Sequence, residues 1–326
     1  MRKSSGFLFC GKEHFLYIKG IAILAIMLSH IGNFSGKTWF TPLGGIGVAI
    51  FLACSGYGLT KSYEKNGLQR YWRKKLTGVY LPFLFVELLF SIVLQRPFWD
   101  VILDITLIDI AYPYGWYMWY LFLCYAFFWL AFRFLPGERS RLCALGGLSL
   151  LSFFLFRSLQ GEQALSFFIG VLWGTYDARV LRSGVGAESH SPEGRMPRKT
   201  RMLLVGGALL LVFVVLLAVK QIPAVRAQHS YLLTLLNLVM KLSCAVGILF
   251  VTWVVHPLTK PLFFVGTISY PLYLTHGYFM FAVTERLLGG YITSSLLMLV
   301  MSFIAAVLLH YVICGIEMLV KRMRAA

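Results

Sequence analysis

Charged residues are scarce in this chain. Only 13% of its 326 residues are Asp, Glu, Lys or Arg, whereas 59% are hydrophobic. A soluble domain needs a more polar surface than this composition can supply. Apolar runs of about 17 to 25 residues, the length of a membrane-crossing helix, recur from residue 16 to residue 320. The sequence therefore predicts a multi-pass membrane protein with no room for a separate soluble domain.

Cysteine pairs and acidic residues are scarce as well. The six cysteines are scattered, mostly inside apolar runs, and form no CxxC pair, so we expect neither a disulfide framework nor a metal site. Only 13 acidic residues oppose 30 Lys and Arg, which gives a net charge of +17. The basic residues form short clusters between apolar runs, which is typical of a membrane topology signal and argues against a nucleic-acid partner. The first apolar run lacks a clear small-residue cleavage site, so we interpret it as a retained helix and not a signal peptide.

The apolar runs predict an all-α bundle of about ten transmembrane helices, which forms a single membrane domain over residues 1–326. Lys and Arg gather in alternate loops, so the positive-inside rule predicts that both termini are cytoplasmic. Residues 183–201 are rich in Ser, Gly, Pro and charge and predict a flexible cytoplasmic linker, and residues 97–115 predict an interfacial segment. The predicted helices are residues 16–34, 43–60, 76–95, 116–135, 142–157, 164–180, 202–219, 231–255, 261–283 and 295–318.

Lys19 and His30 stand out in the first apolar run. On an α-helix their spacing brings them back to within about 20° of one face and separates them by about 16 Å in depth. A snorkelling Lys and a hydrogen-bonded packing His are the structural alternatives. Ionisable groups inside a membrane are costly and usually face the protein interior, so the shared face favours a functional pair.

Two further segments carry polar groups at membrane depth. "GGIGVAIFLACSGYGL", residues 44–59, places Ser55 in a small polar notch, which tight helix packing also explains. "GTISYPLYLTHGYF", residues 266–279, carries His276 at a predicted depth similar to that of His30, so both histidines could border one cavity. Glu87 and Lys241 are further buried polar candidates that need partners.

A cluster of cations, Arg73, Lys74 and Lys75, precedes a helix that Pro82 is expected to kink. Such a cluster is typical of a topology signal or of a contact with anionic lipid. A binding site for a phosphorylated cytosolic ligand is the sharper hypothesis, because several cations are needed to hold phosphate oxygens.

Four segments, in order, resemble the membrane acyltransferase 3 family over essentially the whole chain. They are Lys19 to His30, "GVAIFLACSGY" at 47–57, Lys74 and Lys75 before "YLP" at 80–82, and Ser269 to His276. The resemblance implies transfer of an acyl group, commonly acetyl from acetyl-CoA, to a hydroxyl of a cell-envelope sugar or lipid-linked sugar, by a multi-pass protein of the bacterial plasma membrane. Acyl-CoA would be a donor substrate, with no tightly bound cofactor.

The resemblance also suggests residue roles. His30 matches the family's catalytic His, and Lys19 stands where the family usually has Arg. Arg73, Lys74 and Lys75 would bind the donor, although Gly78 replaces a third basic residue of the family pattern. The alternatives are a transporter or flippase with a buried His and Lys site, and an inactive homologue. Residues expected to line the acceptor cavity are Ser55, Tyr57, Glu87, Ser269, Tyr273 and His276.

Overall fold

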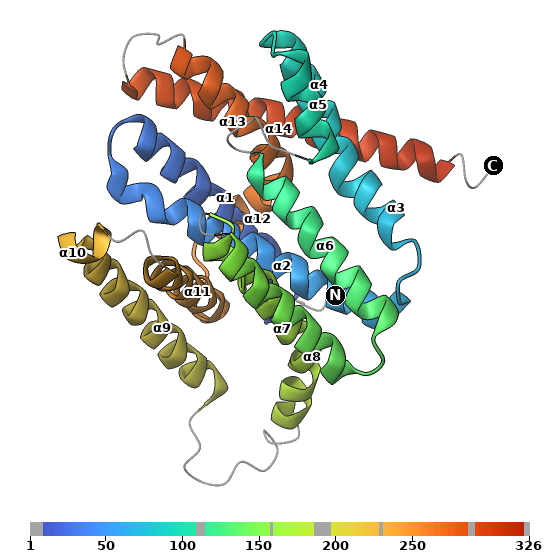
Figure 1. Cartoon of the computed structure of the whole chain (residues 1–326), viewed down its shortest axis with the longest axis vertical. Helices are drawn as coiled ribbons and strands as arrows, with labels where there is room; N and C mark the ends of the chain where they lie inside the picture. The colour runs from blue at the N-terminus through green and yellow to red at the C-terminus, as the bar shows by residue number, and fades with distance from the viewer. Residues whose placement is uncertain are drawn as a thin grey trace, which may run out of the picture.

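The computed structural model describes residues 9–108, 115–156, 159–185, 197–227, 231–285 and 291–322, and within these ranges it contains helices and no strands (Figure 1). The helices pack side by side as a bundle, which confirms the predicted all-α class. Their bounds are α1 Lys12–Phe34, α2 Thr41–Asn66, α3 Tyr71–Lys75, α4 Leu81–Val93, α5 Phe98–Thr106, α6 Trp116–Phe134, α7 Glu138–Leu155, α8 Ser166–Val185, α9 Arg198–Gln221, α10 Pro223–Arg226, α11 Tyr231–Val254, α12 Thr259–Thr267, α13 Ser269–Glu285 and α14 Tyr291–Arg322.

Each of the ten predicted ranges overlaps helix in the described residues. In the described part of the chain, seven helical segments are long and apolar enough to cross a membrane. They are α1, α2, α3 to α4, α6, α9, α11 and the middle of α14. The ranges of α7, α8 and α12 to α13 are helical without meeting that measure, so the count of ten crossings and the cytoplasmic termini stay predictions. Most of the predicted linker, residues 186–196, lies outside the described residues.

Two predicted helices are interrupted, and each interruption lies next to a proline. A π-helical turn, Leu76–Tyr80, joins α3 to α4 directly before Pro82, so the basic cluster lies in the first helical turns and not ahead of them. The predicted helix at 261–283 is divided at Ile268 into α12 and α13. Proline lacks the N–H that a helix interior needs, and Pro271 is therefore accommodated in the first turn of α13.

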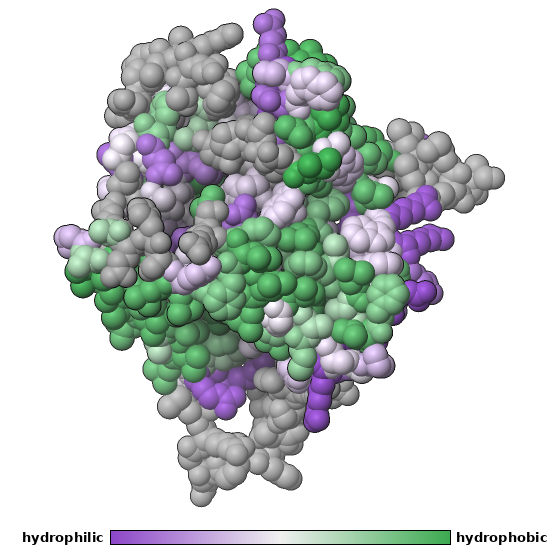
Figure 2. All heavy atoms as spheres, viewed as in Figure 1, coloured by the Kyte–Doolittle hydropathy of each residue, from purple (hydrophilic) through white to green (hydrophobic). Residues whose placement is uncertain are grey.

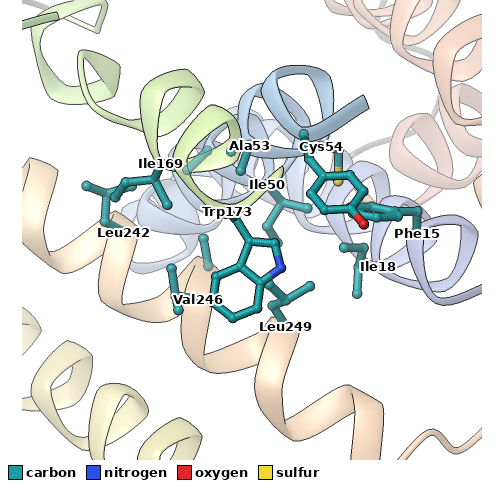
Figure 3. A pocket seen from close by; sticks show the side chains of 14 residues that line it. Phe15, Ile18, Ile50, Ala53, Cys54, Ile169, Trp173, Leu242, Val246 and Leu249 are labelled. Carbon is teal, nitrogen blue, oxygen red and sulfur yellow. The ribbon is translucent and has the colours of Figure 1, made fainter. Parts of the chain in front are cut away.

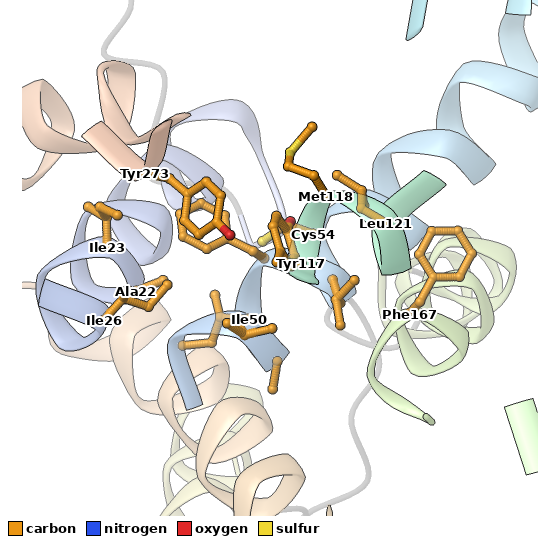
Figure 4. Close-up of a cluster of buried hydrophobic side chains, with 14 of the residues drawn as sticks. Ala22, Ile23, Ile26, Ile50, Cys54, Tyr117, Met118, Leu121, Phe167 and Tyr273 are labelled. Atoms are coloured by element: carbon orange, nitrogen blue, oxygen red, sulfur yellow. The ribbon is translucent and has the colours of Figure 1, made fainter. Parts of the chain in front are cut away.

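The first helix lies in the middle of the bundle, where it packs against α2, α12 and α13 (Figure 1). Glycine also allows a close approach of α2 and α8, because a Cβ on Gly56 would overlap the carbonyl of Phe167. This contact confirms tight helix packing at the predicted small-residue notch. Buried side chains from α1, α2, α6, α8 and α13, including Ile23, Tyr117 and Tyr273, form the core (Figure 4).

The outside of the bundle is strongly apolar. Figure 2 shows a broad hydrophobic face over α9 and the middle of the molecule, with hydrophilic atoms gathered at its edges, including the region of α3. Leu211, Val214 and Val215 of α9 are exposed, as expected for side chains that contact lipid. The short helix α5 exposes Phe98 and Trp99 and buries Asp104. That amphipathic arrangement agrees with the predicted interfacial segment, of which residues 109–114 lie outside the described residues.

Candidate active site

His30 of α1 and His276 of α13 are neighbours. Their ring centroids are 5.3 Å apart, and the rings are tilted by 33°. Nδ1 of His276 lies 3.1 Å from the carbonyl oxygen of Leu272 and 2.7 Å from that of Tyr273. A carbonyl oxygen only accepts hydrogen bonds, so Nδ1 carries the proton and the lone pair of the neutral ring is on Nε2. The packing of α1 against α13 thus brings together two of the predicted site residues.

A cavity of about 170 Å³ adjoins His30. Tyr273 lines it, and the Tyr273 ring lies 5.7 Å from that of His276 and 4.9 Å from that of Tyr117. Figure 4 shows Tyr117 and Tyr273 facing each other beside the aliphatic side chains of α1. The full lining comprises Ile26, Ser29, His30, Asn33, Thr41, Gly44, Gly45, Val48, Trp116, Leu159, Gln163, Lys241 and Tyr273.

One residue of the cavity lining, Lys241, belongs to a buried ion pair. Lys241 of α11, only 5% exposed, is paired with Glu162, and Asn237 donates a hydrogen bond of 2.8 Å to the same carboxylate. Beside it, the amide of Gln163 donates to the carbonyl oxygen of Gly45 at 2.8 Å. Lys241 was expected to need a partner, but the sequence did not identify Glu162. The pair adds two charged groups to the site that were not among the predicted acceptor residues.

At the other end of the Lys19–His30 face, three lysines gather. The ammonium of Lys75 is close enough to those of Lys19 and Lys74 to be repelled by them. Lys75 also lies over the ring of Tyr125, 4.6 Å from its centroid. Arg73 and Lys74 are exposed, whereas Lys75 is half-buried, so the predicted donor cluster is divided between an outward and an inward part.

Tyrosines of α6 lie near both ends of this face. Tyr125 and Tyr117 lie on α6, about 12 Å apart along its axis at 1.5 Å per residue. The Tyr125 hydroxyl is hydrogen-bonded to Ser55, and the Tyr117 ring contacts that of Tyr273. Tyr125 and Ser55 therefore lie at the Lys75 end of α6, and Tyr117 and Tyr273 lie towards the two histidines.

Glu87 belongs to a separate polar network. Arg96 pairs with Glu87 and, at 2.6 Å, with Asp104, and the hydroxyl of Tyr278 donates to Glu87. Burial opposes the charge of Arg96, but Asp104 and Glu87 outweigh it and raise its pKa. Glu87 does not line the His30 cavity. In the described structure Glu87 links α4 to α5 and α13 through this network.

The remaining predicted site residues lie away from the histidines. Ser269 is buried and donates a hydrogen bond to the carbonyl oxygen of Gly266 at 2.8 Å. The hydroxyl of Tyr57 donates to Asp177 at 2.6 Å, and Asp177 is also paired with Lys61. Among the described residues no cluster of three His, Cys, Asp or Glu side chains could hold a metal ion. The role of Ser55, Tyr57, Glu87 and Ser269 in acceptor binding stays a prediction.

Comparison with known protein families finds a family model that matches this chain. The model describes an acyltransferase domain and matches residues 15–314, which include every predicted site residue. No curated protein and no solved structure matches the chain.

Proposed function

The chain belongs to the membrane acyltransferase 3 family, and we propose that it transfers an acetyl group from acetyl-CoA to a hydroxyl of a cell-envelope sugar or lipid-linked sugar. The observation that carries the proposal is the pair of His30 and His276 beside a cavity inside the bundle. Lys19, towards the opposite end of α1 from His30, and Lys75 of α3 are cations that support a donor site there. Acceptor and donor would then approach the reacting centre from opposite ends of α1.

His30 acts as the general base in this mechanism. It removes the proton of the acceptor hydroxyl as the oxygen attacks the thioester carbonyl, and the C–S bond breaks when the tetrahedral intermediate collapses. The proton held by His30 passes to the departing thiolate, so acetyl ester and free thiol are the products. His276 assists because its ring lies beside that of His30 and its lone pair, on Nε2, can stabilise the proton that His30 takes up.

The lysines hold the donor. Lys19, Lys74 and Lys75 supply three positive charges at one end of the bundle, and CoA carries several phosphate groups. Tyr125, Tyr117 and Tyr273 are core residues between the lysines and His30, and the elongated donor would have to displace their packing to reach the histidine. Arg73 and Lys74 are exposed and would bind the donor's phosphates at the solvent-facing surface. Lys75 is half-buried and would contact the part of the donor that enters the protein.

A transporter or flippase that uses the same buried groups is the alternative from another class. It moves the sugar without covalent change, whereas the enzyme adds the mass of one acetyl group. Mass spectrometry of surface polysaccharide, from cells with and without this chain, separates the two functions. We expect the acetyl group only in cells that carry the chain.

The catalytic assignment is tested with His30→Gln in cells that insert the variant normally. We expect acetylation to fall to a small residual level, while His310→Gln, which alters a histidine on α14 away from the cavity, should retain it. Full acetylation by the His30 variant would overturn the assignment. If an acyl group is carried on His30 itself, intact-mass measurement of wild-type protein incubated with acetyl-CoA alone will detect it.

A further inference from the structure

A cavity with basic lining residues, distinct from the cavity beside His30, lies between α8 and the beginning of α9. Its volume is about 180 Å³, and its charged lining residues are Arg198 and Arg201 of α9 and Asp177 of α8. The positive-inside pattern places it on the cytoplasmic side. It is separate from the cluster of Arg73, Lys74 and Lys75, and the proposed acyl transfer does not use it.

Positive charge predominates in this cavity. The carboxylate of Asp177 is already satisfied, because it is paired with Lys61 and accepts the hydroxyl of Tyr57 at 2.6 Å. Two guanidinium groups therefore face the cavity against one carboxylate that has its own partners. Guanidinium binds phosphate oxygens in bidentate fashion and is well suited to an anionic ligand.

Arg198 is held in place by aromatic rings. Its guanidinium carbon lies 5.3 Å from the ring centroid of Trp253 and 6.0 Å from that of Phe9. Cation–π contacts of this kind fix a guanidinium without using its hydrogen-bond donors. The N–H groups of Arg198 thus stay available for a ligand, and little side-chain entropy is lost on binding.

An apolar cavity of about 60 Å³ adjoins the basic one (Figure 3). Trp173 lines both cavities, and in Figure 3 its indole projects between aliphatic side chains that include Val246 and Leu249. Tyr57 connects them as well, since its ring lines the apolar cavity and its hydroxyl bonds to Asp177 in the basic one. A polar mouth and an apolar interior therefore meet at Trp173.

We propose that these two adjoining cavities bind a phosphate-bearing amphiphile, with its phosphate at Arg198 and Arg201 and its apolar arm beside Trp173. Two ligands share this chemistry: an anionic phospholipid of the surrounding bilayer and the CoA of the acyl donor. The phospholipid is the better match because the adjoining cavity is lined almost entirely by apolar side chains.

Binding is measured on the purified full-length chain in neutral detergent, from the ligand-dependent rise of Tm. The probes are dioleoylphosphatidylglycerol, dioleoylglycerol, which lacks the phosphate, and acetyl-CoA. The variants are R198Q/R201Q, the milder R201Q, which alters only the exposed arginine, and V246F, which fills the apolar cavity. R139Q is the matched control, because Arg139 is an exposed arginine that does not line either cavity. All measurements are repeated in a His30→Gln background, so that they do not depend on acyl transfer.

We expect the wild-type chain to bind phosphatidylglycerol and not dioleoylglycerol. The affinity for phosphatidylglycerol should fall about tenfold or more in R198Q/R201Q and detectably in R201Q and in V246F. It should not change in R139Q. If the arginine variants weaken acetyl-CoA binding instead, the phosphate site stands and its ligand is the donor. The proposal is overturned if neither phosphate-bearing probe depends on Arg198 and Arg201 while the R139Q control binds normally. Loss of acetylation in His30→Gln leaves every one of these outcomes unchanged.

Discussion

The imidazole rings of His30 and His276 lie 5.3 Å apart, although they belong to the first and the thirteenth α-helix of the chain. Two imidazolium cations at this separation would repel each other inside a membrane. Nδ1 of His276 donates to backbone carbonyl oxygens, which is compatible with a neutral ring whose Nε2 accepts a proton. This arrangement disfavours two positive charges on the pair and supports the proposed role in proton transfer.

In the proposed mechanism His276 assists the base and does not itself deprotonate the acceptor, so His276→Gln is expected to lower the rate of acetyl transfer without abolishing it. General acid–base assistance is worth about 10²- to 10⁴-fold, and we expect the lower part of that range. The double variant His30→Gln/His276→Gln should be no slower than His30→Gln alone, since residues that act as a unit are not additive.

The three variants are compared by their initial rates of acetyl transfer in membranes from cells that express them, with acetyl-CoA as donor. Unchanged Tm values for the purified proteins show that folding is not the cause. A further loss of rate in the double variant, equal to the product of the two single effects, would show that the two histidines act independently.

Lys241→Met is expected to destabilise the protein by about 3–5 kcal/mol, because it leaves the Glu162 carboxylate in the bundle without its cation. Lys241→Met/Glu162→Gln removes both charges and should recover most of that free energy. The free energy of unfolding in mixed micelles, measured by titration with a denaturing detergent, tests the pair. Lys199→Met, at an exposed lysine of α9, is the control and should change stability by about 0.5 kcal/mol or less. A double variant as unstable as Lys241→Met would contradict the ion-pair interpretation.

Gly45→Ala tests how closely the cavity wall is packed. A Cβ at Gly45 would overlap the end of the Lys241 side chain and displace its ammonium from the wall beside His30. We expect transfer to fall while the helix survives, because Ala is a better helix former than Gly. Gly58→Ala is the matched control on the same helix, since its Cβ would meet no atom within 4 Å, and its rate should stay at the wild-type level. Equal rates for the two variants would show that the position of Lys241 is unimportant for the reaction.

The sequence predicts the helices better than it predicts the partners of buried polar groups. Long apolar runs identify α1, α2 and α11 because membrane thickness fixes how many residues a crossing needs. The break at Ile268 and the π-helical turn before Leu81 depend on local backbone adjustment around Pro271 and Pro82, which hydropathy does not record. The ends of the helices are therefore less predictable than their existence.

The candidate site was partly predictable. Depth along α1 placed His30 level with His276, and the structure brings their rings into contact. The pairing of Lys241 with Glu162 was not predictable, because it depends on how α11 packs against the short turn before α8. The small number of acidic residues did give a signal for this ion pair. Because the chain has only 13 of them, a carboxylate next to a predicted helix is a candidate partner for any buried cation.

Lys19→Arg returns to the first helix the residue that the family usually carries there. If Lys19 holds donor phosphate together with Lys75, arginine should bind it more tightly through its bidentate geometry and lower the KM for acetyl-CoA severalfold. Lys19→Gln should raise that KM by about tenfold, as expected when one charge-assisted hydrogen bond is lost. Lys37→Arg, in the exposed turn after α1, should leave the KM unchanged. A Lys19→Gln variant with wild-type KM and a lower kcat would move Lys19 from donor binding to the reaction itself, because an interaction made only in the transition state changes kcat without changing KM.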